Sequence, residues 1–320
     1  MRTKEKMNAI VTTRYGSPEV LKLEKVEKPI PKDNEVLIKI RATSVTTSDV
    51  LIRGLKVSPI ERFMVQIIFG FGKPRNPILG MVSSGVIESK GKNVTQFGIG
   101  DEVFAYGSVS PTKRRFGSYA EYICLPDDWN IALKPKNSSF EEAAAIPYGG
   151  LLALHLLKKA SLKKGNKVLI YGASGSIGTM AIQLAKNAGA IVTSVCSGKN
   201  FEMVKSLGSD KVIDYTSNKA EAQLETYDYV IDAVGNSKSS HLKEKSKKAL
   251  TPKGKYISID HGTPLTPKEA FIELKNLSEQ GKITPVIDCV FPLEKMAEAH
   301  TYVDKGHKQG NVVIAIGQNS

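Results

Sequence analysis

Short apolar runs alternate with amphipathic stretches through the middle of the chain. The apolar runs have the length and composition of buried strands, and they lie at 168–170, 190–195, 211–214, 227–232 and 254–259. Between the first two runs, residues 177–188 place apolar side chains at helical spacing. Alternating strands and helices indicate βαβ units. The pattern therefore predicts a doubly wound parallel sheet with a ligand at the carboxyl ends of its strands.

The flanking segments alternate residue by residue, as half-buried strands do. Alternation is clear at 36–42, 84–88 and 101–105, and after the middle segment a strand, a helix and a last strand are expected at 286–291, 293–303 and 311–316. The fold class predicted is α/β with two domains. Residues 1–125 and 285–320 form a β-rich domain, and residues 126–284 form the domain with the parallel sheet, placed between them in the sequence.

A glycine-rich turn follows the first buried run, in the segment Lys167-Val-Leu-Ile-Tyr-Gly-Ala-Ser-Gly-Ser-Ile-Gly178. Gly172 and Gly175 would let the backbone turn tightly near a pyrophosphate, whereas Gly178 would let helix pack on strand. The alternative is a sheet whose glycines serve only the turns. Dinucleotide contacts are expected from Gly172, Ser174, Gly175, Ser176, Ile177, Gly178, Gly235 and Asn311.

The end of the second strand indicates which dinucleotide is bound. NAD-binding sheets usually place an acidic residue there for the ribose hydroxyls, but residues 196–200 contain none. Ser197 offers a hydroxyl, Lys199 a cation, and Tyr215 ends the third strand nearby. This set suits a 2′-phosphate, so NADPH is favoured over NADH. The alternative is that Lys199 is only a solvated loop lysine.

The formal charge of the chain is +13, from 45 basic and 32 acidic residues. Such a field attracts anions, including NADPH, RNA and acidic membranes. The basic residues are spread out, with local clusters only at 113–115 and 243–248, and no nucleic-acid module is recognisable. We therefore interpret the charge as a solvated basic surface and expect no specific nucleic-acid partner.

Cysteine usage and hydropathy indicate the compartment. The three cysteines lack paired spacing, and no apolar run approaches the roughly 18 residues that span a bilayer. The charged amino terminus lacks the apolar region of a signal peptide. A cytoplasmic protein without a membrane span is expected. Residues 60–71 are unusually apolar, and they are interpreted either as a core-packed helix or as a lid over an apolar acceptor pocket, with a membrane-surface patch as a third possibility.

Several motifs together resemble those of the medium-chain dehydrogenase/reductase superfamily, in its zinc-free quinone oxidoreductase-like branch. The resemblance covers nearly the whole chain and is carried by the segments at 15–21, 77–87, 100–105, 117–122, 139–145, 281–286, 299–300 and 306–313. It implies a GroES-like catalytic domain beside a Rossmann domain. It also implies hydride transfer from NADPH to a quinone or a conjugated carbonyl.

The resemblance also implies where a metal would be bound. In zinc-bearing relatives the ligands would fall at Thr46, Met81, Val82 and near 148–150, and none of these is a zinc-ligand residue type. No metal is therefore expected. The family motif Val-Asn-x-x-Asp is Val45-Thr-Thr-Ser-Asp49 here. Thr46 and Tyr148 are the candidate catalytic residues, and Asp49 is interpreted as holding the turn.

In relatives a sixth strand follows the fifth and often pairs across a dimer. Residues 260–267 contain two prolines and a glycine, which leave no room for that strand. We therefore expect a five-stranded cofactor sheet, and either a monomer or a dimer built differently. The expected activity is zinc-independent, NADPH-dependent reduction of quinones or α,β-unsaturated carbonyls. The alternatives are a catalytically weak, NADPH-binding regulatory or RNA-binding protein, and a zinc-free alcohol dehydrogenase.

Overall fold

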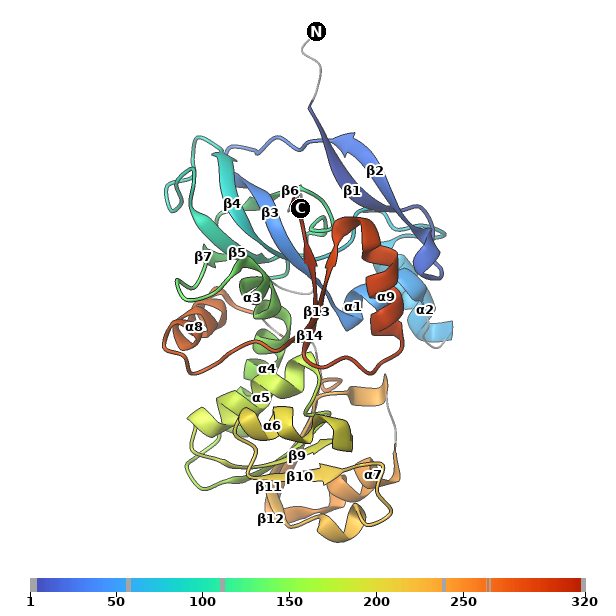
Figure 1. Ribbon diagram of the computed structural model, residues 1–320, viewed down its shortest axis with the longest axis vertical. Coiled ribbons are helices and arrows are strands. Elements are labelled where there is room, and N and C mark those ends of the chain that lie inside the picture. The colour runs from blue at the N-terminus through green and yellow to red at the C-terminus, as the bar shows by residue number, and fades with distance from the viewer. Residues whose placement is uncertain are drawn as a thin grey trace. The chain divides into compact units, whose positions relative to one another are not determined.

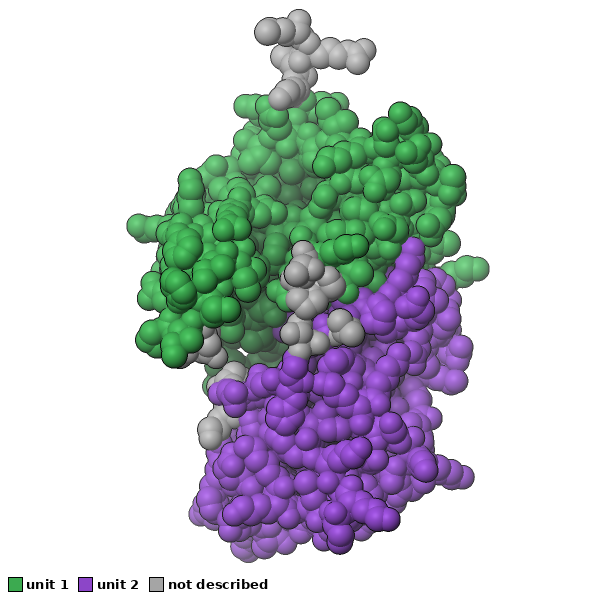
Figure 2. Space-filling view, turned by 180° about the vertical axis from the view of Figure 1, so that it is seen from behind, with its two compact units in different colours: residues 1–147, 287–320 green, residues 148–286 purple. Residues whose placement is uncertain are grey.

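The computed structural model describes residues 5–55, 59–109, 113–237, 240–262, 264 and 266–317. The chain forms two compact units, shown in different colours in Figure 2. Unit 1 is Met1–Pro147 with Ile287–Ser320, and unit 2 is Tyr148–Val286. Each unit has a sheet and a core of its own.

Unit 1 is built on an antiparallel sheet, as the alternation predicts. Its strands run in the order β13-β14-β3-β4-β5-β7, with β6 pairing to β3. Their bounds are β3 Glu35–Val45, β4 Val82–Lys90, β5 Glu102–Tyr106, β6 Tyr122–Pro126, β7 Asn130–Leu133, β13 Ile287–Pro292 and β14 Asn311–Ala315. Only the β13–β14 pair is parallel among those described. A separate hairpin consists of β1 Lys6–Thr12 and β2 Leu21–Glu27.

The helices of unit 1 pack on this sheet or at its edges (Figure 1). They are α1 Thr47–Gly54, α2 Pro59–Phe69, α3 Phe140–Ala145 and α9 Met296–Asp304. The core is formed by the inward positions of the strands, including Val36, Ile38 and Ile40, together with Met296 and Val303 of α9. The expected strand–helix–strand order at the C-terminal end is confirmed.

Unit 2 is a five-stranded, all-parallel sheet in the order β10-β9-β8-β11-β12. The strands are β8 Lys167–Tyr171, β9 Ile191–Cys196, β10 Lys211–Asp214, β11 Tyr227–Asp232 and β12 Leu250–Ser258. The helices are α4 Pro147–Ala160, α5 Ser176–Asn187, α6 Phe201–Ser206, α7 His241–Lys248 and α8 Lys268–Glu279. Because the chain winds outward from β8 in both directions, α5 and α6 cover one face and α7 the other (Figure 1). The described residues between Asp260 and Pro267 form no sixth strand, so five strands are confirmed.

The unit boundary differs from the one expected after residue 125. Unit 1 continues to Pro147 because β7 pairs with β5 and α3 packs against β3, β4 and β14. Ser139 caps α3 through a reciprocal bond pair with Glu142, and Ala143, Ala144 and Ala145 are buried. The small side chains of α3 therefore bind this segment to the antiparallel sheet.

The apolar segment 60–71 is helical, but it is not packed into the core. Within α2 and the following turn, Ile60, Phe63, Met64, Ile67, Ile68 and Phe71 are all exposed. The interpretation of this segment as a core-packed helix is therefore wrong, because its apolar stripe faces away from the core of unit 1. In the described part of the chain, no helix is long and apolar enough to cross a bilayer.

Candidate functional site

The turn after β8 has the backbone that the glycine spacing predicts. Gly172 has φ of 79°, and a Cβ added there would come within 2.4 Å of a Val234 side-chain carbon. The Gly172 and Ala173 N–H groups both donate to the carbonyl of Val195 on β9. The turn is therefore held in a left-handed conformation that glycine alone adopts without strain.

Gly178 lies in the first turn of α5, against the glycine-rich turn itself. A Cβ at this position would come within 2.3 Å of the Gly172 carbonyl oxygen and 2.6 Å of the Ala173 Cα. Both are backbone atoms that cannot move aside cheaply. Gly178 therefore allows the close approach of helix and strand that was expected of it.

Gly175 differs from Gly172 and Gly178 because no protein atoms crowd the position of a Cβ there. It has an ordinary φ of −83° and is the N-cap of α5 with no side chain to accept a hydrogen bond from the first helical N–H groups. A Cβ there would lie 3.6 Å from its nearest neighbour, the Gly172 carbonyl oxygen. The space beside this helix N-terminus is thus kept open, and an anion such as a dinucleotide pyrophosphate fits the donors there.

The residues expected to select the cofactor gather where β9 and β10 end. The Tyr215 N–H donates to the Cys196 carbonyl at 3.2 Å, which ties the two strand ends together. Ser197 is half-buried and accepts a hydrogen bond from the Asn200 side chain, whereas Lys199 is exposed and forms no ion pair with any described residue. A cation is therefore available next to a hydroxyl and a phenol.

An acidic side chain, Asp214, ends β10 beside this cluster. Its carboxylate accepts from the N–H and hydroxyl of Thr216, and the backbone bond is the main reason that its pKa is lowered. The carboxylate also lies close to Gly198. Asp214 thus stabilises the turn that follows β10. An acidic residue that binds the ribose of NAD would instead stand at the end of β9.

A buried polar cluster at the ends of β11 and β12 was missed by the sequence analysis. The carboxylate of Asp232 pairs with Lys243 Nζ at 2.8 Å and accepts from Tyr256 at 2.6 Å and Ser258 at 3.1 Å. Its second oxygen accepts from the N–H groups of Val234 and Gly235. Lys243 belongs to the run 243–248, which was interpreted as solvated. That interpretation is wrong for Lys243, whose side chain is 5% exposed.

This cluster fixes the loop that carries Gly235. Burial raises the pKa of Asp232, but the Lys243 ammonium and the surrounding donors lower it further than burial raises it, and the net shift is downward. Gly235 has φ of 56°, and a Cβ there would meet the Asp260 carboxylate at 2.4 Å. The one sequence feature that could have indicated this cluster is Asp232, an acidic residue at the end of a buried strand.

Thr46 in unit 1 is buried at the N-cap of α1. Its hydroxyl donates to Asp49 Oδ2 at 2.6 Å and accepts from the Asp49 N–H at 3.2 Å, while the Thr46 N–H also donates to that carboxylate. This is a complete capping box, so the interpretation of Asp49 as the residue that holds the turn is confirmed. A hydrogen bond from Thr46 to a substrate would have to replace its bond to Asp49.

Ionisable groups are buried around this cap. Burial raises the pKa of Asp49, and burial with the Asp49 charge raises that of Tyr119. The His300 ring packs edge-on against Tyr119 at 5.6 Å, and burial lowers its pKa to about 3. Arg53 is 0% exposed and binds Asp304 at 2.6 Å and the Gly16 carbonyl at 2.9 Å. The neutral His300 is therefore suited to packing rather than to proton transfer near pH 7.

The remaining predicted residues belong to different units. Tyr148 is half-buried in the first turn of α4 and is part of unit 2. Ser174, Ser176 and Ile177 lie in or beside the glycine-rich turn of unit 2, whereas Asn311 begins β14 in unit 1 and is buried. Each unit thus contributes candidate residues of its own.

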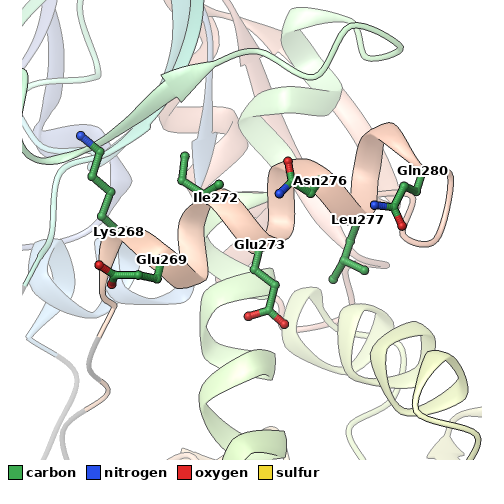
Figure 3. A pocket seen from close by; sticks show the side chains of 7 residues that line it. All are labelled: Lys268, Glu269, Ile272, Glu273, Asn276, Leu277 and Gln280. Carbon is green, nitrogen blue, oxygen red and sulfur yellow. The ribbon is translucent and has the colours of Figure 1, made fainter. Parts of the chain in front are cut away.

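A surface hollow of about 560 Å³ lies along α8. Figure 3 shows that the labelled side chains lining it come from this one helix and from Gln280, the residue that follows it. A hollow along a single helix face offers no convergent donors for a dinucleotide. The glycine-rich turn is therefore the better candidate for a cofactor site.

The donor set does not fit a catalytic zinc ion. Thr46, Met81, Val82 and Tyr148 provide no imidazole, thiolate or carboxylate. Among the residues that the structure describes, no group of three or more His, Cys, Asp or Glu side chains is placed to hold a metal.

Family models match both parts of the chain. The alcohol dehydrogenase GroES-like domain matches residues 32–136, and the zinc-binding dehydrogenase domain matches residues 176–285. A 2-methylene-furan-3-one reductase of Solanum lycopersicum is 34% identical over 96% of this chain and 79% of that protein. The chain belongs to the medium-chain dehydrogenase/reductase superfamily. Within that superfamily it lies in the quinone oxidoreductase-like branch.

Two further members of the superfamily cover almost the whole chain. The NADPH-dependent alkenal/one oxidoreductase of Arabidopsis thaliana chloroplasts is 32% identical over 97% of this chain and 80% of its own length. The structure of the quinone oxidoreductase from Coxiella burnetii superposes with a TM-score of 0.83 at 28% identity, over 97% of this chain and 99% of that one. The GroES-like and Rossmann assignments are confirmed, and the protein is an oxidoreductase of a nicotinamide-dependent family.

Proposed function

We propose that this protein reduces quinones or α,β-unsaturated carbonyls with NADPH and without a metal. The observation that carries the proposal is the uncrowded N-terminus of α5 at Gly175, behind a turn that Gly172 and Gly178 fix. The names of the relatives supply the acceptor class, and small-molecule substrates follow from it. We further propose that it works in the cytoplasm.

In this proposal the residues of unit 2 hold the cofactor. The first N–H groups of α5 bind the pyrophosphate, and Ser174, Ser176 and Ile177 line the turn. Ser197, Lys199 and Tyr215 bind the 2′-phosphate, and Asn311 is a further proposed cofactor contact. When bound, the nicotinamide supplies a hydride.

The acceptor needs hydrogen-bond donors because negative charge develops on its oxygen as the β-carbon or quinone ring is reduced. Thr46 and Tyr148 are the proposed donors. Tyr148 brings a phenol at the start of α4, and Thr46 can donate only by leaving Asp49. Each would orient the carbonyl, and a protein hydroxyl or water would supply the proton.

We expect Tyr148→Phe to lower kcat/KM by about tenfold or more, which corresponds to a lost hydrogen bond of about 1.5 kcal/mol to a charged group. Thr46→Val should also lower it, with some loss of stability because the cap of α1 is removed. Steady-state kinetics of both variants, with Thr46→Ser as the variant that keeps the cap, measure this. If both Tyr148→Phe and Thr46→Val retain full kcat/KM, neither residue has this role.

We expect Lys199→Ala to weaken NADPH binding roughly tenfold to a hundredfold and to leave NADH binding nearly unchanged, because only the 2′-phosphate engages the ammonium. Fluorescence titration with each cofactor measures both affinities. Lys205→Ala is the matched control, since Lys205 is also exposed but pairs with Glu202 on α6. Equal losses for the two cofactors in Lys199→Ala would contradict the assignment.

The activity itself is tested by following NADPH oxidation with a quinone, an enone and a saturated aldehyde, with NADH as a control. Turnover of the first two with a preference for NADPH is expected. Reduction of the aldehyde alone would favour an alcohol dehydrogenase. Tight NADPH binding without turnover would favour a regulatory protein. The bond from the Thr46 hydroxyl to Asp49 is consistent with that alternative, because it occupies the hydrogen that a substrate would need.

A further inference from the structure

Among the residues that the structure describes, the apolar stripe of α2 is the most extended exposed apolar feature, and the proposed function does not use it. Its members recur at helical spacing on one face, and they are Ile60, Phe63, Met64, Ile67, Ile68 and Phe71. Ile60 is 79% exposed and even Ile67 is 42% exposed. At about 200 Å² for a large side chain, the stripe exposes roughly 700 Å², which is above the range of about 300–600 Å² that is usual for the largest apolar patch of a soluble monomer.

The helix is held in place from its other side, so the stripe is a defined surface. Phe69 packs edge-on against Phe116 with 5.5 Å between ring centroids, next to the core of unit 1. Tyr15 donates to the Gly70 carbonyl at 2.8 Å, and Arg75 donates to the Ile67 carbonyl at 3.1 Å. On the outer side, Phe63 and Phe71 contact each other at 6.1 Å.

The charges around the stripe are mostly positive, because Glu61 is the one acidic residue of α2 and three cations stand in α2 and in the turn after it. Arg62, Lys73 and Arg75 are exposed on the helix and on the turn after it. Residues 62–87 contain no Asp or Glu, and the whole chain carries +13. An exposed apolar stripe bordered by cations is the pattern of a helix that lies in the interface of an anionic bilayer.

A second copy of the chain fits this surface less well. A symmetric contact through the stripe would bring the same three cations of both copies to one interface, where like charges oppose association. Anionic lipid headgroups complement these cations, while the acyl region accepts the apolar side chains. Charge complementarity therefore selects the bilayer.

We propose that α2 and the turn to Arg75 form a docking surface for anionic lipid bilayers. The stripe enters the interface between headgroups and acyl chains, and Arg62, Lys73 and Arg75 bind the headgroups. The inference stands apart from the reductase proposal, because lipid binding needs neither cofactor nor turnover. If both hold, an acceptor dissolved in the membrane would be within reach of the docked protein.

The test is flotation of the full-length protein with vesicles of phosphatidylcholine and phosphatidylserine, compared with vesicles of phosphatidylcholine alone. We expect binding to the anionic vesicles only. Phe63→Gln with Ile67→Gln should weaken it at least tenfold. The matched control is Ile30→Gln with Ile99→Gln, because both isoleucines are strongly exposed elsewhere on unit 1 and should leave binding unchanged.

A second set of variants, in which charges are reversed, distinguishes docking through α2 from general attraction of a basic protein to anionic vesicles. Arg62→Glu with Lys73→Glu should weaken vesicle binding far more than Lys219→Glu with Lys253→Glu, which changes the net charge equally at exposed positions of unit 2. The proposal is overturned if the wild-type protein fails to float with anionic vesicles, or if either α2 variant binds no worse than its control. It is also overturned if analytical ultracentrifugation shows that Phe63→Gln with Ile67→Gln abolishes a dimer, or if that variant only raises KM for a water-soluble quinone.

Discussion

Gly178→Ala should destabilise unit 2 by about 3 kcal/mol or more and abolish dinucleotide binding with it. The added methyl would lie 2.3 Å from the Gly172 carbonyl oxygen and 2.6 Å from the Ala173 Cα. Overpacking of a core by one methyl costs about 1–3 kcal/mol when side chains can adjust. Here the obstructing atoms are backbone, so α5 must move away from the turn. Chemical denaturation and cofactor titration measure the two losses.

Gly175→Ala is the matched variant for this experiment. The same methyl would meet nothing closer than 3.6 Å, and the φ of −83° suits alanine. The free energy of unfolding should therefore stay within about 0.5 kcal/mol of the wild-type value. Cofactor affinity should nevertheless fall, because the methyl occupies the space left for a pyrophosphate. Unchanged cofactor affinity in Gly175→Ala would contradict the assignment of this helix end as the anion site.

Lys243→Met should cost about 3–5 kcal/mol of stability at pH 8, since it leaves the Asp232 carboxylate buried without its cation. Tyr256 and Ser258 still donate to that carboxylate, but they cannot replace the charge. Urea denaturation of the variant measures the loss. Lys247→Met is the matched control on the same helix. Its ammonium pairs with Glu244 at the surface, where such a pair is worth about 0–1 kcal/mol.

The loss of stability in Lys243→Met should depend on pH, whereas a loss caused by packing alone would not. In the wild type the pKa of Asp232 is lowered by Lys243 and the hydroxyl donors, so its contribution is present above the unfolded pKa and is lost as the pH falls through the folded pKa. Burial is the largest influence on this carboxyl and raises its pKa, so loss of the Lys243 ammonium should move the pKa upward from its wild-type position and protonation should relieve the variant. The deficit of Lys243→Met should therefore shrink between pH 8 and pH 4. A deficit that is constant with pH would contradict the role of charge.

The five strands of unit 2 and five of the strands of unit 1 were predicted because the patterns of the two units have different periods, whereas β1, β2, β6 and β7 were not predicted. Continuous apolar runs such as 168–170 are buried on both faces, whereas the alternation at 36–42 marks a sheet with two unlike faces. The glycine-rich turn was predictable too, since backbone demands at Gly172 and Gly178 depend on local geometry. The observed boundary after Pro147 could not be predicted, because the pairing of β7 with β5 is a long-range contact.

Polar partners were the other limit of prediction. Lys243 stands in a run of lysines, and nothing local distinguishes it from Lys247, yet one lies in the interior and the other at the surface. Its burial depends on Asp232, which the sheet brings to it from the end of β11. The orientation of α2 was undecided for a related reason. Its periodicity gives an apolar face, but only the packing of Phe69 against Phe116 decides which side faces out.

The order of synthesis bears differently on the two units. Unit 2 is one continuous stretch, Tyr148–Val286, so all of its strands have been made before the ribosome reaches the C-terminal segment. Unit 1 needs β14, which lies inside its sheet and pairs with β3 from Val312 opposite Val45, one residue before Thr46. The dinucleotide fold can therefore form on the nascent chain, whereas the cap of α1 gains its supporting strand only after the whole of unit 2 has been made.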